Sequence, residues 1–399
     1  MTPETKPRLR RELQFFTHQD ENVPELYIHD PEGYVEGIEA LHRGVLGILQ
    51  YFNGDHTLAA IAQDLGDKVT LRDLVGFATQ LDTALFFEGD GLDAARKERS
   101  DWIGATVRPP AHAGRGYPID DEGAAAFLDE HLAAGGEQTG SVTRLIAPHI
   151  DLQLGSEIHG QAHARLRAGG RPDLVVVLGV AHQSTEHPFV ACRKDFATPR
   201  GTVRYDAKFV DALEEHYGES ISDGVLVHKT EHSIEFQALW LAHHWAEDPP
   251  AMVPILVRGF HESIEAGESP SGLPHVERFL AALRKTMAED GRHIVVLASV
   301  DLAHVGPIYD HDEGLDEDGE RELAVADRPL LDAMVHDDAE GFFEAIAAEK
   351  NRRHVCGVAP IYLTLRLGGG EGELLGYGQG RIHPESGSVV SYAAIAYPA

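Results

Sequence analysis

Apolar runs that alternate with helical patterns constrain the fold of this chain more than any other feature. From about residue 105 onward there are four short runs rich in β-branched side chains, namely RLIAPHI, LVVVLGV, MVPILV and HIVVLAS. Runs that are apolar at nearly every position are typical of strands inside a parallel sheet that is covered on both faces. The segments between them, such as 156–167 and 232–246, have helical spacing of apolar residues. We therefore predict a three-layer α/β domain with a mostly parallel sheet, closed by a final strand in SVVSYAAIAY.

A different pattern occupies the N-terminal part of the chain. Residues 38–89 contain three helical patterns separated by NGDHT and GDKVT, with Thr57 and Thr70 in position to cap helices. LQFF and ELYIHDPEG favour short strands, and the charged segment DGLDAARKERSDWIG is typical of a linker. This layout resembles the compact winged-helix-like modules related to the peptide-binding protein PqqD. Because 399 residues exceed what one hydrophobic core usually organises, we expect a small winged-helix-like domain with its linker over 1–104 and the α/β domain over 105–399.

The overall charge narrows the range of partners. Acidic residues outnumber basic ones by 65 to 34, which gives a formal net charge of −31. A surface of this sign repels phosphate backbones and anionic lipids, so neither a nucleic-acid nor a membrane partner is expected. The N-terminal MTPETKPRLRRELQFF lacks the apolar core of a signal peptide, and no stretch is apolar over the length of a membrane span. With only Cys192 and Cys356 there is no disulfide framework, and we expect a cytoplasmic protein.

Histidine is in clear excess, with 24 in the chain. His149 follows RLIAP, His182 follows LVVVLGVA, and His304 follows HIVVLASVDLA. The carboxyl ends of parallel strands meet at one edge of a sheet, where ligands of α/β proteins bind. A single histidine there is more often a hydrogen-bonded structural residue, but three at equivalent strand ends favour a shared site. Because imidazole is the commonest metal ligand, we predict a metal site at this edge.

An aspartate and a cysteine are candidates for the same site. Asp301, in SVDLAH, could ligate a metal or orient an imidazole, and an Asx turn or N-cap explains it equally well. Cys356 opens CGVAPIYLTLRL, where Gly357 suits the start of a helix. A helix N-terminus lowers the pKa of a thiol and makes it reactive. The alternative is a small buried apolar residue, an interpretation that fits Cys192 better.

The helix predicted from EHSIEFQALWLAHHW begins with ionisable residues. His232 and Glu235 are three residues apart and so share one face, and Glu231 lies one turn before Glu235. They could bind a metal or act as general acid and base, although a supporting role at the helix N-terminus is slightly favoured. We take Glu231 and His232 as candidate catalytic residues. His243 and His244 are predicted to lie at a solvent-facing end.

Seven motifs occur in the order found in the Memo family, also called the MEMO1 family and, in bacteria, AmmeMemoRadiSam system protein B. They are RPPAHAGRGYP (108–118), APHID, LGVAHQ, TEHSIE, SVDLAH, CGVAPI and SVVSYAA. The resemblance runs from about residue 107 to the C-terminus and implies a fold similar to the class III extradiol dioxygenases. It also implies a pocket that binds iron or copper through the residues His149, His182, Asp301, His304 and Cys356. Association with a radical-SAM protein and an AMMECR1-like protein is a further implication. After the first histidine, PHIDLQLGS replaces the frequent PHAGYxYSG, so the tyrosine of that pattern is absent.

Three functions are compatible with these residues. The first is a metal-dependent redox or oxygenase-type enzyme, in which histidines hold iron or copper and Cys356, Asp301 or Glu231 assists electron or proton transfer. The second is a non-catalytic binding module that recognises a peptide or an anionic ligand at the same pocket. The third, hydrolysis by zinc with His149, His182 and Asp301, requires zinc to be the tightly bound metal and is less favoured.

Overall fold

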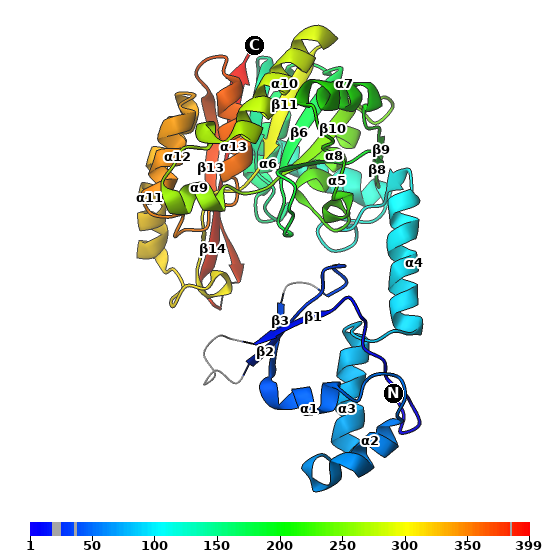
Figure 1. The fold of residues 1–399 in the computed structure, drawn as a ribbon. Helices are drawn as coiled ribbons and strands as arrows, with labels where there is room; N and C mark the ends of the chain where they lie inside the picture. Colours follow the sequence, from blue (N-terminus) through cyan, green and yellow to red (C-terminus); the bar gives the residue numbers. More distant parts are fainter. Residues whose placement is uncertain (18–24, 36–37, 384) are drawn as a thin grey trace. The chain divides into compact units, whose positions relative to one another are not determined.

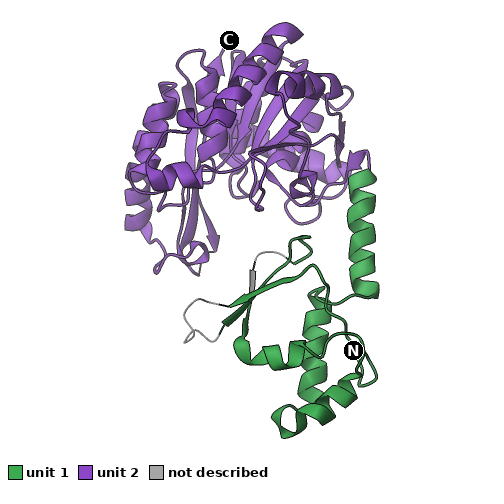
Figure 2. Cartoon of the chain, viewed as in Figure 1, with its two compact units in different colours: residues 1–104 green, residues 105–399 purple. Residues whose placement is uncertain are grey.

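The computed structural model describes residues 1–17, 25–35, 38–383 and 385–399. The chain forms two compact units, Met1–Gly104 (unit 1) and Ala105–Ala399 (unit 2), which Figure 2 shows in separate colours. None of the helices in the described ranges combines the length and the apolar character that crossing a bilayer requires.

Unit 1 combines an antiparallel three-stranded sheet with helices. Its strands pair in the order β1-β2-β3, and its apolar core includes Leu26 and Ile28 of β2 together with Leu58 and Leu74 of two helices. The described elements are β1 (Gln14–Thr17), β2 (Glu25–His29), β3 (Ile38–His42), α1 (Leu46–Leu49), α2 (Leu58–Leu65), α3 (Leu71–Thr83) and α4 (Asp90–Gly104).

The structure tests the local predictions for unit 1. The hydroxyls of Thr57 and Thr70 accept hydrogen bonds from backbone N–H groups at the starts of α2 and α3, so both predicted caps are confirmed. The charged segment predicted as a linker forms helix α4, which buries Leu92 and Trp102. The start of the first predicted helix is strand β3, because its backbone pairs with β2. The winged-helix resemblance stays a prediction.

Unit 2 contains a large mixed sheet. Its strands follow the order β12-β14-β5-β11-β6-β10-β7, with β13 paired to β14, and Figure 1 shows the central strands side by side. These strands are β5 (Val142–Ala147), β6 (Leu174–Val180), β7 (Phe189–Ala191), β10 (Ala251–Val257), β11 (Ile294–Ser299), β12 (His304–Val305), β13 (Glu373–His383) and β14 (Ser388–Pro398). A smaller sheet joins β4 (Val107–Arg108), β8 (Asp195–Thr198) and β9 (Gly201–Val203).

The α/β class is confirmed, but the prediction of a mostly parallel sheet is only partly right. The four central strands β5, β11, β6 and β10 are parallel, as expected for the four apolar runs. Both flanks are antiparallel, because β7 runs back beside β10 and the hairpin β13–β14 places the last strand against β5. A hairpin connection requires antiparallel strands, whereas the crossovers between the central strands contain helices.

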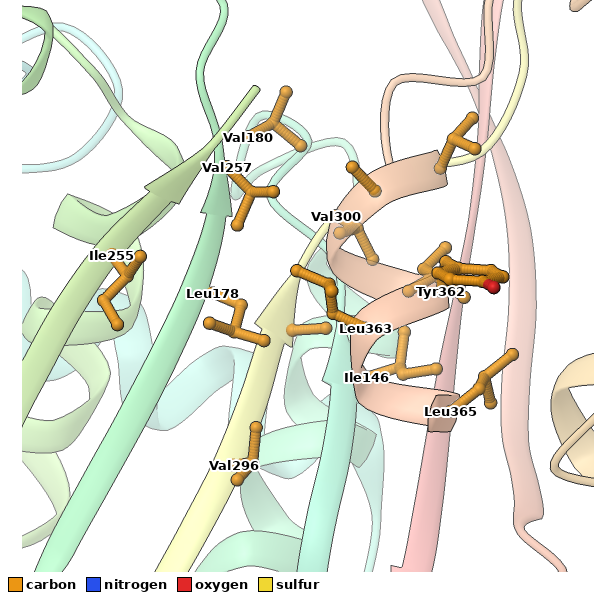
Figure 3. Packing of buried hydrophobic residues seen from close by; sticks show 14 of the residues in the cluster. Ile146, Leu178, Val180, Ile255, Val257, Val296, Val300, Tyr362, Leu363 and Leu365 are labelled. Atoms are coloured by element: carbon orange, nitrogen blue, oxygen red, sulfur yellow. The ribbon is translucent and has the colours of Figure 1, made fainter. Parts of the chain in front are cut away.

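Helices cover both faces of this sheet. Along β6, Leu174, Val176 and Leu178 point into one apolar cluster while Val175 and Val177 point into another. Figure 3 shows part of the first cluster, where side chains of β5, β6, β10 and β11 face α13. The helices of unit 2 are α5 (Asp121–Gly135), α6 (Ser156–Ala168), α7 (Ala207–Tyr217), α8 (Ser233–His244), α9 (His261–Ala266), α10 (Pro274–Asp290), α11 (Glu317–Val335), α12 (Ala339–Ala347) and α13 (Val358–Leu367).

Candidate metal centre

Three imidazoles meet at the carboxyl edge of the parallel strands. His149 and His182 each stand two residues beyond the end of a strand, β5 and β6, and both strands pair in parallel with β11. His232 directly precedes α8. The three ring centroids lie 4.8 to 5.0 Å apart, and one nitrogen from each ring lies within 4.8 Å of the other two. The described residues therefore contain a group of imidazoles spaced closely enough to hold one metal ion.

Hydrogen bonds set the tautomer of two of the three rings. His149 Nδ1 lies 2.9 Å from the carbonyl oxygen of Ser299 and must donate to it. His182 Nδ1 lies 3.0 Å from both carboxylate oxygens of Glu231, and His232 Nδ1 lies 3.3 Å from Glu231 Oε1. With hydrogen on Nδ1 of His149 and His182, the lone pair of each of these two rings is on Nε2. This is the arrangement in which a histidine binds a metal while its other nitrogen is held by an acceptor.

Glu231 is a buried carboxylate that organises two of the rings. Besides its contacts with the two imidazoles, Glu231 accepts hydrogen bonds from the backbone N–H of His182 at 3.2 Å and from that of Ser233 at 2.9 Å. Burial opposes its ionisation, but the hydrogen bond from His182 and the nearby imidazoles hold the pKa of Glu231 well below its usual value. In turn Glu231 raises the pKa of His182 despite the burial of that ring. The predicted acidic helix start thus supports the imidazoles rather than facing solvent.

A second buried ion pair fixes the segment that carries Glu231. The Arg108 guanidinium donates to the carbonyls of His228 and Glu231, each at 2.7 Å, and to Glu235 at 2.6 Å. Glu235 also accepts hydrogen bonds from two backbone N–H groups and from the Tyr117 hydroxyl. Neither charged side chain of the pair is exposed. Glu235, which the sequence pattern placed on the face of His232, is therefore a structural partner of Arg108.

Cys356 lies against the imidazole group at the start of α13. Its Sγ is 3.5 Å from His149 Nε2 and 3.6 Å from the backbone oxygen of Asp301. The following Gly357 permits this approach, because a Cβ there would be 2.7 Å from the same oxygen of Asp301 and from Val300 Cβ. The predicted lowering of the thiol pKa by the helix N-terminus is wrong. Burial, and then the Asp301 carboxylate, raise the pKa of Cys356 well above its usual value.

Asp301 stands beside His149 and links two strand ends. Its Oδ1 accepts the backbone N–H groups of His149 and Ile150, each at 3.1 Å, and its Oδ2 lies 3.6 Å from His149 Nε2. Burial raises the pKa of Asp301 to about 7, against the effect of those two hydrogen bonds. These hydrogen bonds join segments about 150 residues apart, so they are not the local Asx turn or N-cap that the sequence offered as an alternative, and a role of Asp301 as metal ligand or orienting group stays a prediction.

His304 is near the group but outside it. Its Nδ1 donates to the carbonyl of Leu302 at 3.1 Å, and its ring packs edge-on against Tyr309 with centroids 5.0 Å apart. Burial lowers the pKa of His304 to about 4, and the charge of His182 lowers it further. Among the described residues the third ring of the close group is His232, and the role of His304 as a metal ligand stays a prediction.

Burial keeps two rings of the group neutral. Burial is the largest cause that lowers the pKa of His149 well below its usual value, followed by the charges of His182 and His232. Burial likewise lowers the pKa of His232 to about 4. Neutral imidazoles are the form that binds metal.

Two other predictions about cysteine and histidine have clear outcomes. Cys192 is a fully buried apolar residue, as predicted, and burial raises the pKa of its thiol to about 12. The predicted solvent-facing position of His243 and His244 is wrong. The His243 side chain is 6% exposed and pairs with Asp129, and burial lowers the pKa of His244 to about 3.

Sequence reasoning also missed a fourth ring near the site. The ring of His112 lies 5.6 Å from that of His232, and its Nε2 donates to the carbonyl of Thr230 at 2.9 Å. It comes from the loop after the two-residue strand β4, and no apolar run precedes it in the sequence, so the strand-end criterion could not find it. The motif RPPAHAGRGYP that contains it was the available signal.

Comparison with known proteins identifies relatives that match most of the chain. A MEMO1 family protein of Aquifex aeolicus is 27% identical over 310 residues, which cover 77% of this chain and 77% of that protein. The MEMO1 family protein of Methanopyrus kandleri is 29% identical over 306 residues, covering 73% of this chain and 98% of the relative. That of Thermus thermophilus is 26% identical over 287 residues, covering 72% and 82%. The sequence profile of the Memo-like proteins matches residues 108–396, which include every residue of the imidazole group and Cys356. The chain belongs to the Memo family.

Proposed function

We propose that unit 2 is a metal-dependent oxidoreductase of the oxygenase type that uses iron or copper. One observation carries the proposal. Nitrogen atoms of His149, His182 and His232 converge within 4.8 Å of one another, and Cys356 Sγ lies 3.5 Å from His149 Nε2. The predicted similarity of the fold to class III extradiol dioxygenases supports an oxygenase by analogy alone.

The residues present fit such a metal. The acceptors on Nδ1 of His149 and His182 leave the Nε2 of each of these rings free to bind, His232 Nδ1 lies 3.3 Å from Glu231, and Cys356 offers a sulfur ligand beside them. Imidazole and thiolate suit iron, copper and zinc, whereas magnesium and calcium prefer oxygen ligands. The raised pKa of the Cys356 thiol means that the free protein holds it protonated, so binding of a cation would release that proton.

The chain's own groups have separate tasks in this proposal. A bound iron or copper ion would supply one-electron chemistry with dioxygen as the oxidant. Glu231 holds the ring of His182 in its binding tautomer and lies 3.3 Å from His232 Nδ1. Asp301 Oδ2, with a pKa of about 7 caused by burial, can hold or release a proton 3.6 Å from His149 Nε2. Association with radical-SAM and AMMECR1-like proteins remains part of the proposal.

Metal content tests the proposal directly. The full chain is purified without oxygen and assayed for iron, copper and zinc, beside His182→Ala, Cys356→Ser and the control His336→Ala, an exposed residue directly after α11. We expect about one iron or copper ion per chain in the wild type and in the control, and a clear loss in the two site variants. Redox activity is then tested by exposing the reduced, metal-loaded protein to air and following its oxidation in the absorbance spectrum.

Two outcomes would contradict the proposal. Substoichiometric metal that neither site variant changes, and that added iron or copper does not restore, would favour a non-catalytic binding module for a peptide or an anion. Zinc as the tightly bound, activity-supporting metal would favour hydrolysis instead.

A further inference from the structure

Two adjoining cavities open beside the imidazole group. One, of about 480 Å³, is lined by His182 and Cys356 together with residues of α9 and of the segment 350–355. The other, of about 400 Å³, lies across His182 and reaches Arg258 and His275. The two share the lining residues Ala181, His182 and 259–261, so they form neighbouring parts of one hollow. A volume of this size suits a small molecule.

The charge of this hollow is opposite to that of the chain. The charged residues of its lining, histidines aside, are Arg258, Lys350, Arg352, Glu262 and Glu265. Bases thus outnumber acids by three to two, whereas in the whole chain acids outnumber bases by 65 to 34. Basic side chains gathered in a cleft attract anions even when the rest of the surface repels them.

The basic side chains of the hollow have no strong ion pair within the described part of the chain. In the described part of the chain neither Arg258 nor Arg352 has a carboxylate within ion-pair distance, and the side chain of Arg258 donates a hydrogen bond to the carbonyl of Glu186. Lys350 is 3.9 Å from Glu265, with both side chains about two thirds exposed, so that pair is weak. These cations therefore remain available to a ligand.

The segment that carries Lys350 and Arg352 is held in an unusual conformation. Lys350, Asn351 and His354 have φ of 53°, 50° and 50°, which makes three of the six non-glycine residues with positive φ in the described ranges. Asn351 bonds to the backbone N–H and carbonyl of Val355, and Arg353 pairs with the buried Asp327. Strained backbone held by its surroundings in this way is typical of functional sites.

We propose that this hollow is the substrate site and that it takes a small anionic substrate carrying a phosphate or carboxylate group. Lys350 and Arg352 bind the anionic group, Phe260 and Val358 line the space for the carbon skeleton, and the reacting end lies at His182 and Cys356. The segment 350–355 sets the distance between the bound anion and Cys356, which directly follows this segment. That the bound anion is a substrate rests on the proposed function, but binding of the anion at this site can be tested without metal.

Calorimetric titration of the metal-free full chain tests the proposal. The probes are phenyl phosphate, benzoate and the uncharged benzyl alcohol. We expect one or both anions to bind and benzyl alcohol not to bind, and the tighter anion identifies the phosphate or the carboxylate. The double variant Lys350→Gln/Arg352→Gln should weaken anion binding at least about tenfold, since two charge-assisted contacts are lost.

Matched variants make the result specific. Lys285→Gln/Arg328→Gln removes the same charge from exposed positions on α10 and α11 and should leave the affinity unchanged, and Arg352→Lys should keep most of it. Absence of anion binding, equal binding of benzyl alcohol, or equal weakening by both double variants would overturn the proposal. Because these titrations use metal-free protein, a failure of the metal assignment leaves them interpretable, and the metal content of the same variants is measured separately.

Discussion

His244, at the end of α8, is a buried imidazole whose ring nitrogens have no hydrogen-bond partner among the described residues. Its ring lies 5.6 Å from that of Trp240 and 5.5 Å from that of His163. Burial is the main reason that the pKa of His244 falls to about 3, and the charges of His243 and Arg167 lower it further. At neutral and mildly acid pH the native protein therefore carries this ring neutral.

Protonation of His244 in the unfolded chain lowers the free energy of unfolding at acid pH. An unfolded histidine has a pKa near 6.5, so below that pH the unfolded chain binds a proton that the folded chain rejects. His244 therefore leaves the free energy of unfolding undiminished above pH 6.5, and the free energy of unfolding decreases as the pH falls toward the folded pKa of His244. For one such histidine the loss is about 0.7 kcal/mol between pH 7 and 6 and about 2 kcal/mol between pH 7 and 5.

His244→Phe removes this loss while keeping a ring of similar shape. We expect the variant to be at least as stable as the wild type at pH 7, because no hydrogen bond is lost, and the difference in its favour to grow by about 2 kcal/mol at pH 5. Urea unfolding followed by tryptophan fluorescence at pH 7, 6 and 5 measures it. The other histidines titrate in both proteins and cancel, and His336→Phe, at an exposed position, should show no such growth. Parallel stability curves for His244→Phe and the wild type would refute the reasoning.

Two further substitutions test the supports of the imidazole group. Glu235→Gln leaves the Arg108 guanidinium without its buried anion and should destabilise unit 2 by about 3–5 kcal/mol in urea unfolding; a change no larger than that of a surface ion pair would contradict this role. Glu231→Gln keeps the shape of the side chain but removes the charge that holds His182 and His232, and should weaken metal binding about 10- to 100-fold in a chelator competition. An unchanged affinity with Glu231→Gln would show that the rings are held by other contacts.

Local patterns predicted the elements that depend on local physics. LVVVLGV coincides with β6, because a strand buried on both faces needs apolar side chains at successive positions. Thr57 and Thr70 cap helices because the cap is a contact with residues three positions away. The helical conformation of the charged segment 90–104 was not predicted, because its helix buries only Leu92 and Trp102, too few apolar residues to show a stripe in the sequence.

The position of the site followed from the sequence, but its exact membership did not. Apolar runs that end in histidine place His149 and His182 at one sheet edge, since parallel neighbours align their carboxyl ends. The choice of His232 rather than His304 as the third ring depends on how α8 packs on the sheet and on Glu231, 49 residues from its partner His182. The pKa of Cys356 was likewise decided in three dimensions, because burial and the Asp301 carboxylate act across the fold and outweigh the local helix terminus. Short-range pattern can specify strands, caps and the edge where a site forms, whereas contacts between distant segments set which side chains meet there and in what protonation state.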